Sequence, residues 1–133
     1  MENSEHKKIL IVDDDISMRE ILSVILNNKY QLLFAEDGET ALEILEREKG
    51  VGLIFLDIIL PGINGLEVLK RVKEISPDIW VIMMSIVKDA EVVVEAMEIG
   101  AKDYMVKMID YDGVLNMVGK AFSEMGRKGE SLN

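Results

Sequence analysis

The sequence predicts an α/β fold in which a doubly wound, five-stranded parallel sheet is flanked by five helices. Three observations favour it. Short apolar runs alternate with longer segments of helical periodicity, the alternation continues along nearly the whole chain, and two of the runs end in aspartates. Continuous apolar runs are typical of strands buried on both faces of a parallel sheet. Strict alternation of strand and helix implies right-handed crossovers, with helices on both faces.

The first strand and helix are predicted from the apolar run Ile9–Val12 and the segment after it. That segment has apolar residues at the i, i+3, i+4, i+7 and i+8 positions of an amphipathic helix, namely Met18, Ile21, Leu22, Ile25 and Leu26. Ser17 and Glu20 have the spacing of a capping box, which predicts that the helix begins there. The second strand is expected at Gln31–Ala35.

The middle of the chain predicts a buried strand between two helices. A helix over about Glu39–Glu48 follows the turn residues Asp37-Gly38, and the strand Leu53–Leu56 comes next. The third helix is expected to start at Asn64, with Leu66, Leu69, Val72 and Ile75 as its buried stripe.

The last third of the chain predicts two more strands, Trp80–Met84 and Asp103–Val106. Between them, a helix over about Asp89–Ile99 ends at Gly100, a residue suited to helix termination. The fifth helix starts near Asp110 and places Val114, Leu115, Val118, Phe122 and Met125 on one face. We expect residues 1–126 to form one domain, and residues 127–133 to form a polar, frayed tail.

Composition excludes several classes of function. The chain has 133 residues and no cysteine, so disulfides and thiol catalysis are excluded. Its one histidine, His6, precedes the first strand, which argues against a histidine-based triad or zinc site. The net charge of −10 predicts no direct binding of nucleic acid. The absence of a signal peptide and of an apolar run of ~20 residues predicts a cytoplasmic protein that does not bind membranes.

Aspartates follow two of the predicted strands. Asp57 ends the run Leu53–Leu56, and Asp13-Asp14-Asp15 follows Ile9–Val12. In the flavodoxin-like strand order 2-1-3-4-5, strands one and three are neighbours, and ligands bind at the carboxyl ends of the strands. This order brings Asp13, Asp14 and Asp57 together, and such a group of carboxylates requires a divalent cation, for which Mg²⁺ is well suited.

Two further strand ends complete the expected site. Lys107 follows the fifth strand, and Ser85 follows the fourth. Three carboxylates, one lysine and a divalent cation would leave the site neutral, so it could accept an anionic phosphoryl group, with the Ser85 hydroxyl bound to one of its oxygens.

With these residues in place, the sequence resembles the receiver domain of response regulators in two-component signalling, the fold of the chemotaxis response regulator. The matching stretches cover nearly the whole chain in the order of the family. They are Ile9 to Asp15, Leu56-Asp57 through Pro61 to Asn64-Gly65, Met83-Met84-Ser85, and Gly100 to Lys107.

The resemblance implies a role for each matching residue. Asp57 is the phosphoacceptor. Asp14 and Asp57 bind Mg²⁺ directly, Asp13 acts mostly through water, and the backbone carbonyl of Ile59 completes the protein ligands. Lys107 pairs with Asp57 or the phosphoryl oxygens. Two further residues are implied to respond to the phosphoryl group. The Ser85 hydroxyl follows it, and the Tyr104 ring moves inward together with that hydroxyl.

The same resemblance implies the partners. A histidine kinase or phosphotransfer protein donates the phosphoryl group, and the phosphorylated domain changes the face formed by its fourth helix, fifth strand and fifth helix. An output domain, an effector protein or a phosphorylation-dependent homodimer would receive the signal. The domain catalyses only its own phosphorylation and dephosphorylation, and so it is not expected to be an enzyme.

Alternatives remain at several positions. Asp15 is better explained as a helix cap than as a metal ligand. A haloacid-dehalogenase-like phosphatase would need an acid at Ile59, and a nucleotide-binding domain would need a phosphate-binding loop where the three acids stand. A pseudo-receiver that only docks partners stays open, as the runner-up.

The chain departs from the family pattern in three places. Met108 replaces the usual proline after Lys107, which predicts a trans peptide bond. Ile86 is bulky where the family has a small residue, which predicts slower phosphorylation by small donors. Ile59 and Val87 are apolar where polar residues can position a hydrolytic water, which predicts a long-lived phosphoryl group.

Overall fold

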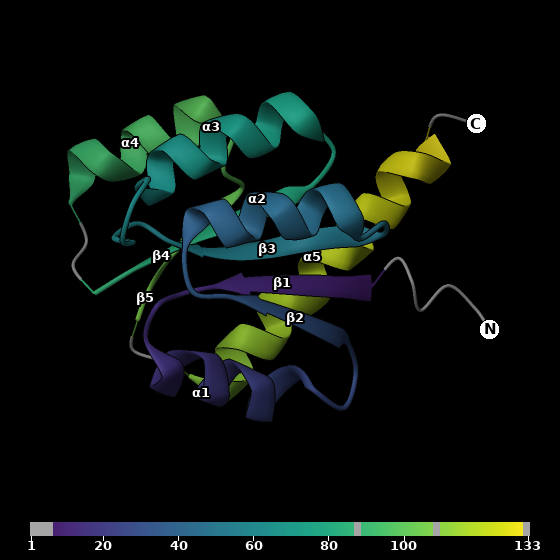
Figure 1. Cartoon of the computed structure of the whole chain (residues 1–133). Coiled ribbons are helices and arrows are strands. Elements are labelled where there is room, and N and C mark those ends of the chain that lie inside the picture. The colour runs from purple at the N-terminus through teal and green to yellow at the C-terminus, as the bar shows by residue number, and fades with distance from the viewer. Residues whose placement is uncertain (1–6, 87–88, 108–109, 132–133) are drawn as a thin grey trace.

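Five parallel strands form one sheet between two layers of helices (Figure 1). The computed structural model describes residues 7–86, 89–107 and 110–131, and the side chains of this range up to Gly126. In chain order the elements are β1 (Lys8–Val12), α1 (Ile16–Leu26), β2 (Gln31–Ala35), α2 (Gly38–Arg47), β3 (Val51–Asp57), α3 (Gly65–Ile75), β4 (Trp80–Ser85), α4 (Ala90–Ile99), β5 (Asp103–Val106) and α5 (Tyr111–Ser131). The order across the sheet is β2-β1-β3-β4-β5, which confirms the flavodoxin-like prediction.

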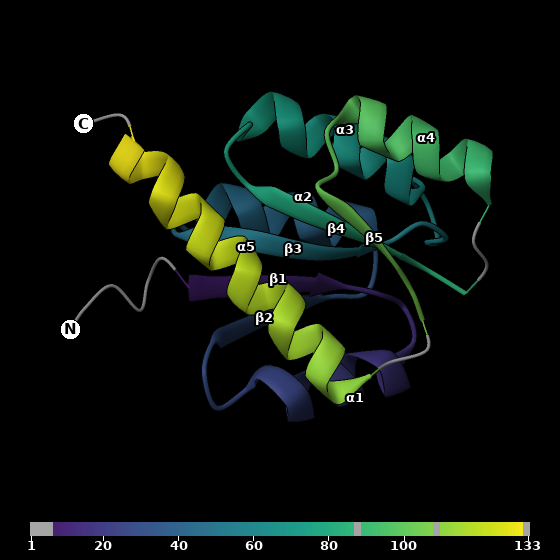
Figure 2. The same ribbon diagram turned by 180° about the vertical axis from the view of Figure 1, so that it is seen from behind.

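The sheet separates two hydrophobic clusters. Helices α2, α3 and α4 cover one face, whereas α1 and α5 cover the other; α5 crosses in front of the sheet in Figure 2. Side chains alternate along each strand, so Ile9 and Ile11 of β1 pack toward α1 and α5, and Leu10 and Val12 pack toward α2 to α4. The central strands are therefore buried on both sides, as their continuous apolar runs predicted.

Polar caps fix where four of the helices begin. The side chains of Asp15, Asp37, Asn64 and Asp89 each accept a hydrogen bond from a backbone N–H in the first turn of the next helix. The capping box expected at Ser17 is wrong, because Asp15 caps α1 and Ser17 lies within its first turn. The explanation of Asp15 as a cap is confirmed.

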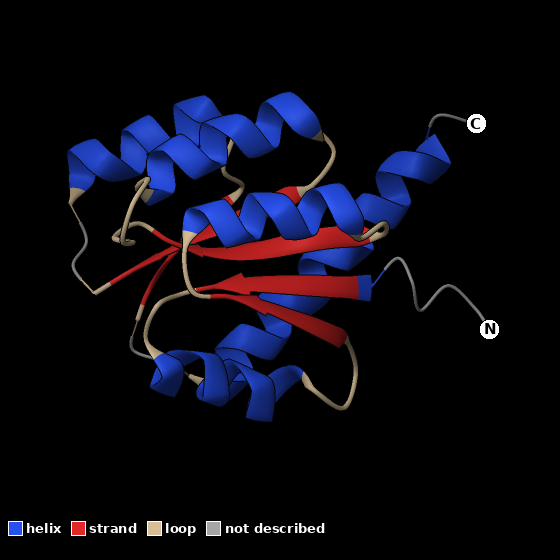
Figure 3. Ribbon diagram, viewed as in Figure 1, coloured by secondary structure: helices blue, strands red, loops and turns tan. Residues whose placement is uncertain are grey.

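The helices differ from the predictions in two details. Ile21 and Ile75 were assigned to buried stripes, yet their side chains are 43% and 49% exposed, whereas Val68 is fully buried. Helix α5 continues past residue 126 to Ser131, so the expected frayed tail is helical over residues 127–131 (Figure 3). The domain boundary at residue 126 stays a prediction. None of the described helices is both long and apolar enough to span a membrane.

Strand register brings the predicted site to one edge of the sheet. Val12 pairs with Leu56, Asp57 with Met84, and Ser85 with Val106. Because all the strands are parallel, the residues that end them meet at the carboxyl edge of the sheet.

Candidate functional site

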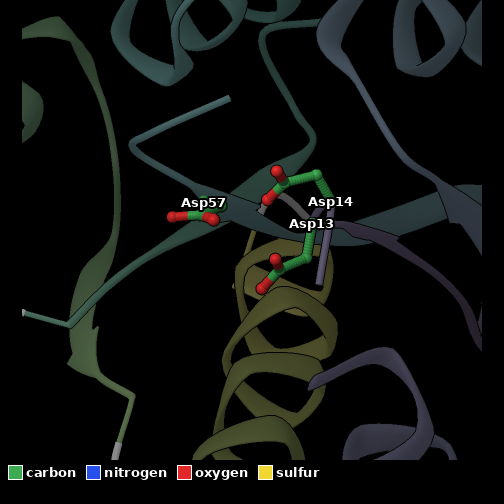
Figure 4. A group of neighbouring side chains, drawn as sticks. All are labelled: Asp13, Asp14 and Asp57. Carbon is green, nitrogen blue, oxygen red and sulfur yellow. The ribbon is translucent and has the colours of Figure 1, made fainter. Parts of the chain in front are cut away.

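Three carboxylates meet at the carboxyl ends of β1 and β3. One oxygen each from Asp13, Asp14 and Asp57 lies within 4.8 Å of the others (Figure 4). Asp13 is fully buried and Asp57 is 5% exposed, whereas Asp14 is exposed to solvent. The structure therefore brings together the three acids whose proximity was predicted from the strand order.

Lys107 connects the two buried acids. Its Nζ lies 2.8 Å from Oδ2 of Asp57, to which it donates a hydrogen bond, and 2.7 Å from Oδ2 of Asp13. Oδ2 of Asp13 has no partner with hydrogen-bond geometry among the described residues. One lysine thus offsets only part of the charge of three carboxylates, and further positive charge is needed to neutralise the group.

Burial and charge act in opposite directions on this group. Burial raises the pKa of Asp57 and the charge of Asp13 raises it further, although the hydrogen bond from Lys107 partly opposes both. Burial alone would lower the pKa of Lys107, but the contacts with Asp13 and Asp57 outweigh it and raise that pKa above its usual value. The lysine is therefore a fixed cation, and the ionised form of Asp57 is costly without further positive charge.

The chemistry of these groups fits Mg²⁺. All three side chains offer carboxylate oxygens, the hard ligands that Mg²⁺ prefers, and one side of the group is open to water at Asp14. Ile59 lies beside the acids, since its backbone N–H donates to Oδ1 of Asp57 at 3.2 Å. The Ile59 side chain is 72% exposed and is directed to solvent.

Ser85 lies at the same edge, and Tyr104 lies further away from it. Ser85 is buried at the end of β4, and its backbone oxygen accepts a hydrogen bond from the backbone of Lys107 at 2.8 Å. Tyr104 is half-buried on β5 and packs against the hydrophobic cluster beneath α2, α3 and α4. Tyr104 therefore lies on the face of the sheet that α2, α3 and α4 cover.

Comparison with known proteins agrees with this geometry. Residues 9–119 match the response regulator receiver domain family. The chain belongs to this family. It is therefore a receiver domain of the kind found in two-component response regulators.

Relatives of the receiver domain differ greatly in length. Sporulation initiation phosphotransferase F of Bacillus subtilis is 37% identical over 116 residues, which are 86% of this chain and 93% of that protein. Transcriptional regulatory protein ZraR of Klebsiella oxytoca is 39% identical over 83% of this chain, but the match spans 25% of that longer protein. A CheY-like receiver domain from Methanospirillum hungatei JF-1 superposes with a TM-score of 0.87 at 28% identity, covering 92% of this chain and 98% of that structure.

The sequence analysis did not identify one residue that lies beside the site. Arg19 of α1 donates from Nη1 to the backbone oxygen of Asp13 at 2.6 Å. An arginine on a helix carries no sequence signal for this contact, because its acceptor is a backbone carbonyl. The predictions for Val87 and for the peptide bond between Lys107 and Met108 concern positions outside the described residues of the receiver domain.

Proposed function

We propose that this receiver domain takes a phosphoryl group onto Asp57 from a phosphohistidine, in the presence of Mg²⁺. The donor is a histidine kinase or a phosphotransfer protein. The observation that carries the proposal is the position of the Asp57 carboxylate, nearly buried, hydrogen-bonded to Lys107 and within 4.8 Å of the other two acids. Such an arrangement is suited to holding one more anionic group only when a cation joins it.

The transfer needs little covalent chemistry from the protein. A carboxylate oxygen of Asp57 attacks phosphorus in line, the P–N bond of the donor breaks, and its electron pair returns to the imidazole nitrogen. Lys107, which now contacts Asp13 and Asp57, stabilises charge on the transferring oxygens. The buried hydroxyl of Ser85 binds one of those oxygens.

The metal would be held by the acids already together. Asp14 and Asp57 would bind it directly, Asp13 would act mostly through water, and the backbone carbonyl of Ile59 would complete the protein ligands. When bound, Mg²⁺ supplies positive charge that neutralises the transferring oxygens. The fit rests on three carboxylate oxygens within one small volume, whose charge a single lysine offsets only in part.

Phosphorylation then alters the surface formed by α4, β5 and α5. Ser85 and Tyr104 read the phosphoryl group, and the packing of Tyr104 beneath α4 is the part that changes. The receiver would pass the signal to an output domain, an effector protein or a second copy of itself, in the cytoplasm. It turns over no external substrate. The match to one quarter of the longer ZraR supports an output domain as the recipient of the signal.

Intact mass measurement tests the proposal. After incubation with Mg²⁺ and acetyl phosphate, the wild type should gain one phosphoryl group (~80 Da), and Asp57→Asn should gain none. Asp78→Asn removes an exposed acid just before the amino end of β4, at the opposite edge of the sheet from the site, and should behave as the wild type.

A metal control and a second phosphoryl donor complete the test. Excess EDTA should abolish the gain, because the transfer depends on the cation. If neither the wild type nor Ile86→Ala gains mass from acetyl phosphate, and a phosphohistidine donor also fails, the receiver only docks partners and the proposed function is wrong.

A further inference from the structure

Asp13 is held at each of its polar groups. Its backbone N–H donates to Ala35 of β2 at 3.0 Å, and its Oδ1 accepts from the backbone N–H of Asp15 at 2.9 Å. Oδ2 contacts Lys107, and the backbone oxygen accepts from Arg19 at 2.6 Å. The contact from Arg19 differs from the others because it comes from a side chain of α1, the helix that directly follows the acids.

Asp14 has no comparable support of its own. Its carboxylate is exposed, and no hydrogen bond to that side chain is seen in the described part of the chain. Its position therefore depends on the backbone that leads into it. The backbone oxygen of Asp13 belongs to the peptide unit that joins Asp13 to Asp14, and that unit is planar. Fixing this oxygen fixes the direction in which the chain enters Asp14.

Arg19 is placed to provide that restraint. It lies in the first turn of α1, and its own backbone N–H donates to the oxygen of Asp15 at 3.2 Å. Helical side chains point toward the start of their helix, so the Arg19 guanidinium returns over the loop that carries the acids. The Arg19 side chain is half-buried, and its short, charge-assisted hydrogen bond to the backbone oxygen of Asp13 links the two ends of the segment from Asp13 to Arg19.

We propose that Arg19 is a positioning residue for the cation site, which acts through the Asp13–Asp14 peptide to hold the Asp14 carboxylate in place. The inference rests on the proposed function, since it assigns Arg19 to the Mg²⁺ site described above. It concerns binding of the metal by the unphosphorylated domain and can be measured without phosphoryl transfer.

The sign of the effect separates positioning from simple electrostatics. A positive charge close to three carboxylates repels a cation, so removing the charge alone should strengthen Mg²⁺ binding. If Arg19 positions Asp14, its removal should weaken Mg²⁺ binding despite the lost repulsion. A role limited to stabilising the fold would leave the affinity of the folded domain unchanged.

Isothermal titration with Mg²⁺ on the full chain tests this. We expect Arg19→Met to raise the Mg²⁺ dissociation constant at least threefold. Arg19→Lys keeps a charged donor on a shorter stem, and its dissociation constant should lie between those of Arg19→Met and the wild type. Arg71→Met is the matched control, because Arg71 is an exposed arginine on α3 that bonds only to Glu67 among the described residues; it should bind as the wild type.

Each outcome has one meaning. An unchanged or lower dissociation constant for Arg19→Met overturns the inference, and if that variant does not fold, Arg19→Lys must show weaker binding for the inference to stand. Melting temperatures without Mg²⁺ identify any loss of folding. A wild type that binds no Mg²⁺ overturns the proposed function together with this inference, whereas a wild type that binds and an Arg19→Met that binds equally well overturns this inference alone.

Discussion

At the scale of single residues, Ile86 is the bulky neighbour of the site. It follows Ser85 directly, and its side chain is 74% exposed at the end of β4. We expect this apolar side chain, next to the buried Ser85, to obstruct the approach of a small phosphoryl donor and its hydration shell. We expect Ile86→Ala to be phosphorylated several-fold faster than the wild type by acetyl phosphate, in a time course followed by intact mass. Equal rates would refute the obstruction.

Ile59 gives a second prediction at this scale. Its backbone bonds to Asp57, but its exposed side chain offers no polar atom to a water beside the site. We therefore expect the phosphoryl group to persist for minutes at neutral pH once the donor is removed. Ile59→Asn supplies a side chain that can hold such a water, and should shorten the lifetime. Loss of the group from the wild type within seconds would contradict the prediction.

The site residues were predictable to the extent that strand ends identified them. Parallel strands end at one edge, so the aspartates, Ser85 and Lys107 could be placed together from the sequence and the strand order. Arg19 could not be found in this way, because its partner is a backbone oxygen and its position depends on the direction of a helix side chain. The roles assigned to the aspartates, Lys107, Ser85 and Tyr104 stay predictions.

At the scale of elements, the turn between β3 and α3 leaves no room for a side chain at Gly65. A Cβ there would lie 2.2 Å from the backbone oxygen of Asp57 and 2.7 Å from Cα of Ile58. Since both neighbours are backbone atoms, the turn itself would have to move. We expect Gly65→Ala to lower the free energy of unfolding by ~1–3 kcal/mol in urea titrations.

Gly119 is the matched control for this substitution. It lies on an exposed part of α5, and a Cβ at this position would have no neighbouring atom within 4 Å, so alanine meets no obstacle there. Gly119→Ala should raise the free energy of unfolding by ~0.5–1 kcal/mol, because alanine favours the helix. If both variants were destabilised equally, close approach at Gly65 would not be the reason.

Helix starts were easier to predict than helix faces. The side chains of Asp37, Asn64 and Asp89 cap the helices that follow them, as residues of these types commonly do. At α1 the cap is Asp15, two residues before the predicted Ser17. The buried faces depend on how each helix turns against the sheet. For this reason Ile75, apolar and correctly spaced, is exposed at the end of α3. The length of α5 beyond residue 126 was missed because its last residues are polar and glycine-containing.

At the scale of the whole molecule, the acid cluster links metal binding to stability. A cation that binds only the folded domain stabilises it, by about 1.4 kcal/mol at ten times its dissociation constant. We expect Mg²⁺ to raise the melting temperature of the wild type, and Asp14→Asn to reduce the rise. The change should be followed by thermal unfolding over a series of Mg²⁺ concentrations.

The pH dependence of this rise follows from Asp57. Burial raises its pKa, so the folded domain without metal is favoured when Asp57 is protonated, and that stability is lost as the pH rises through the raised pKa. Mg²⁺ requires the ionised carboxylate and competes with the proton. The rise in melting temperature should therefore be larger at pH 7 than at pH 5. A larger rise at pH 5 would show that Asp57 is not a ligand.

The pairing of β1 with β3 also has a consequence for how the chain folds. Ile9 pairs with Leu53 across all of α1, β2 and α2, so the centre of the sheet closes only after a long stretch of chain has been brought into place. Such non-local pairing slows folding relative to helical bundles of similar size. Before β3 pairs with β1, the free edge of β1 is apolar, and a strand of another incompletely folded chain can pair with it. The arrangement that gathers the acids therefore also sets the step at which a newly made chain is most exposed to aggregation.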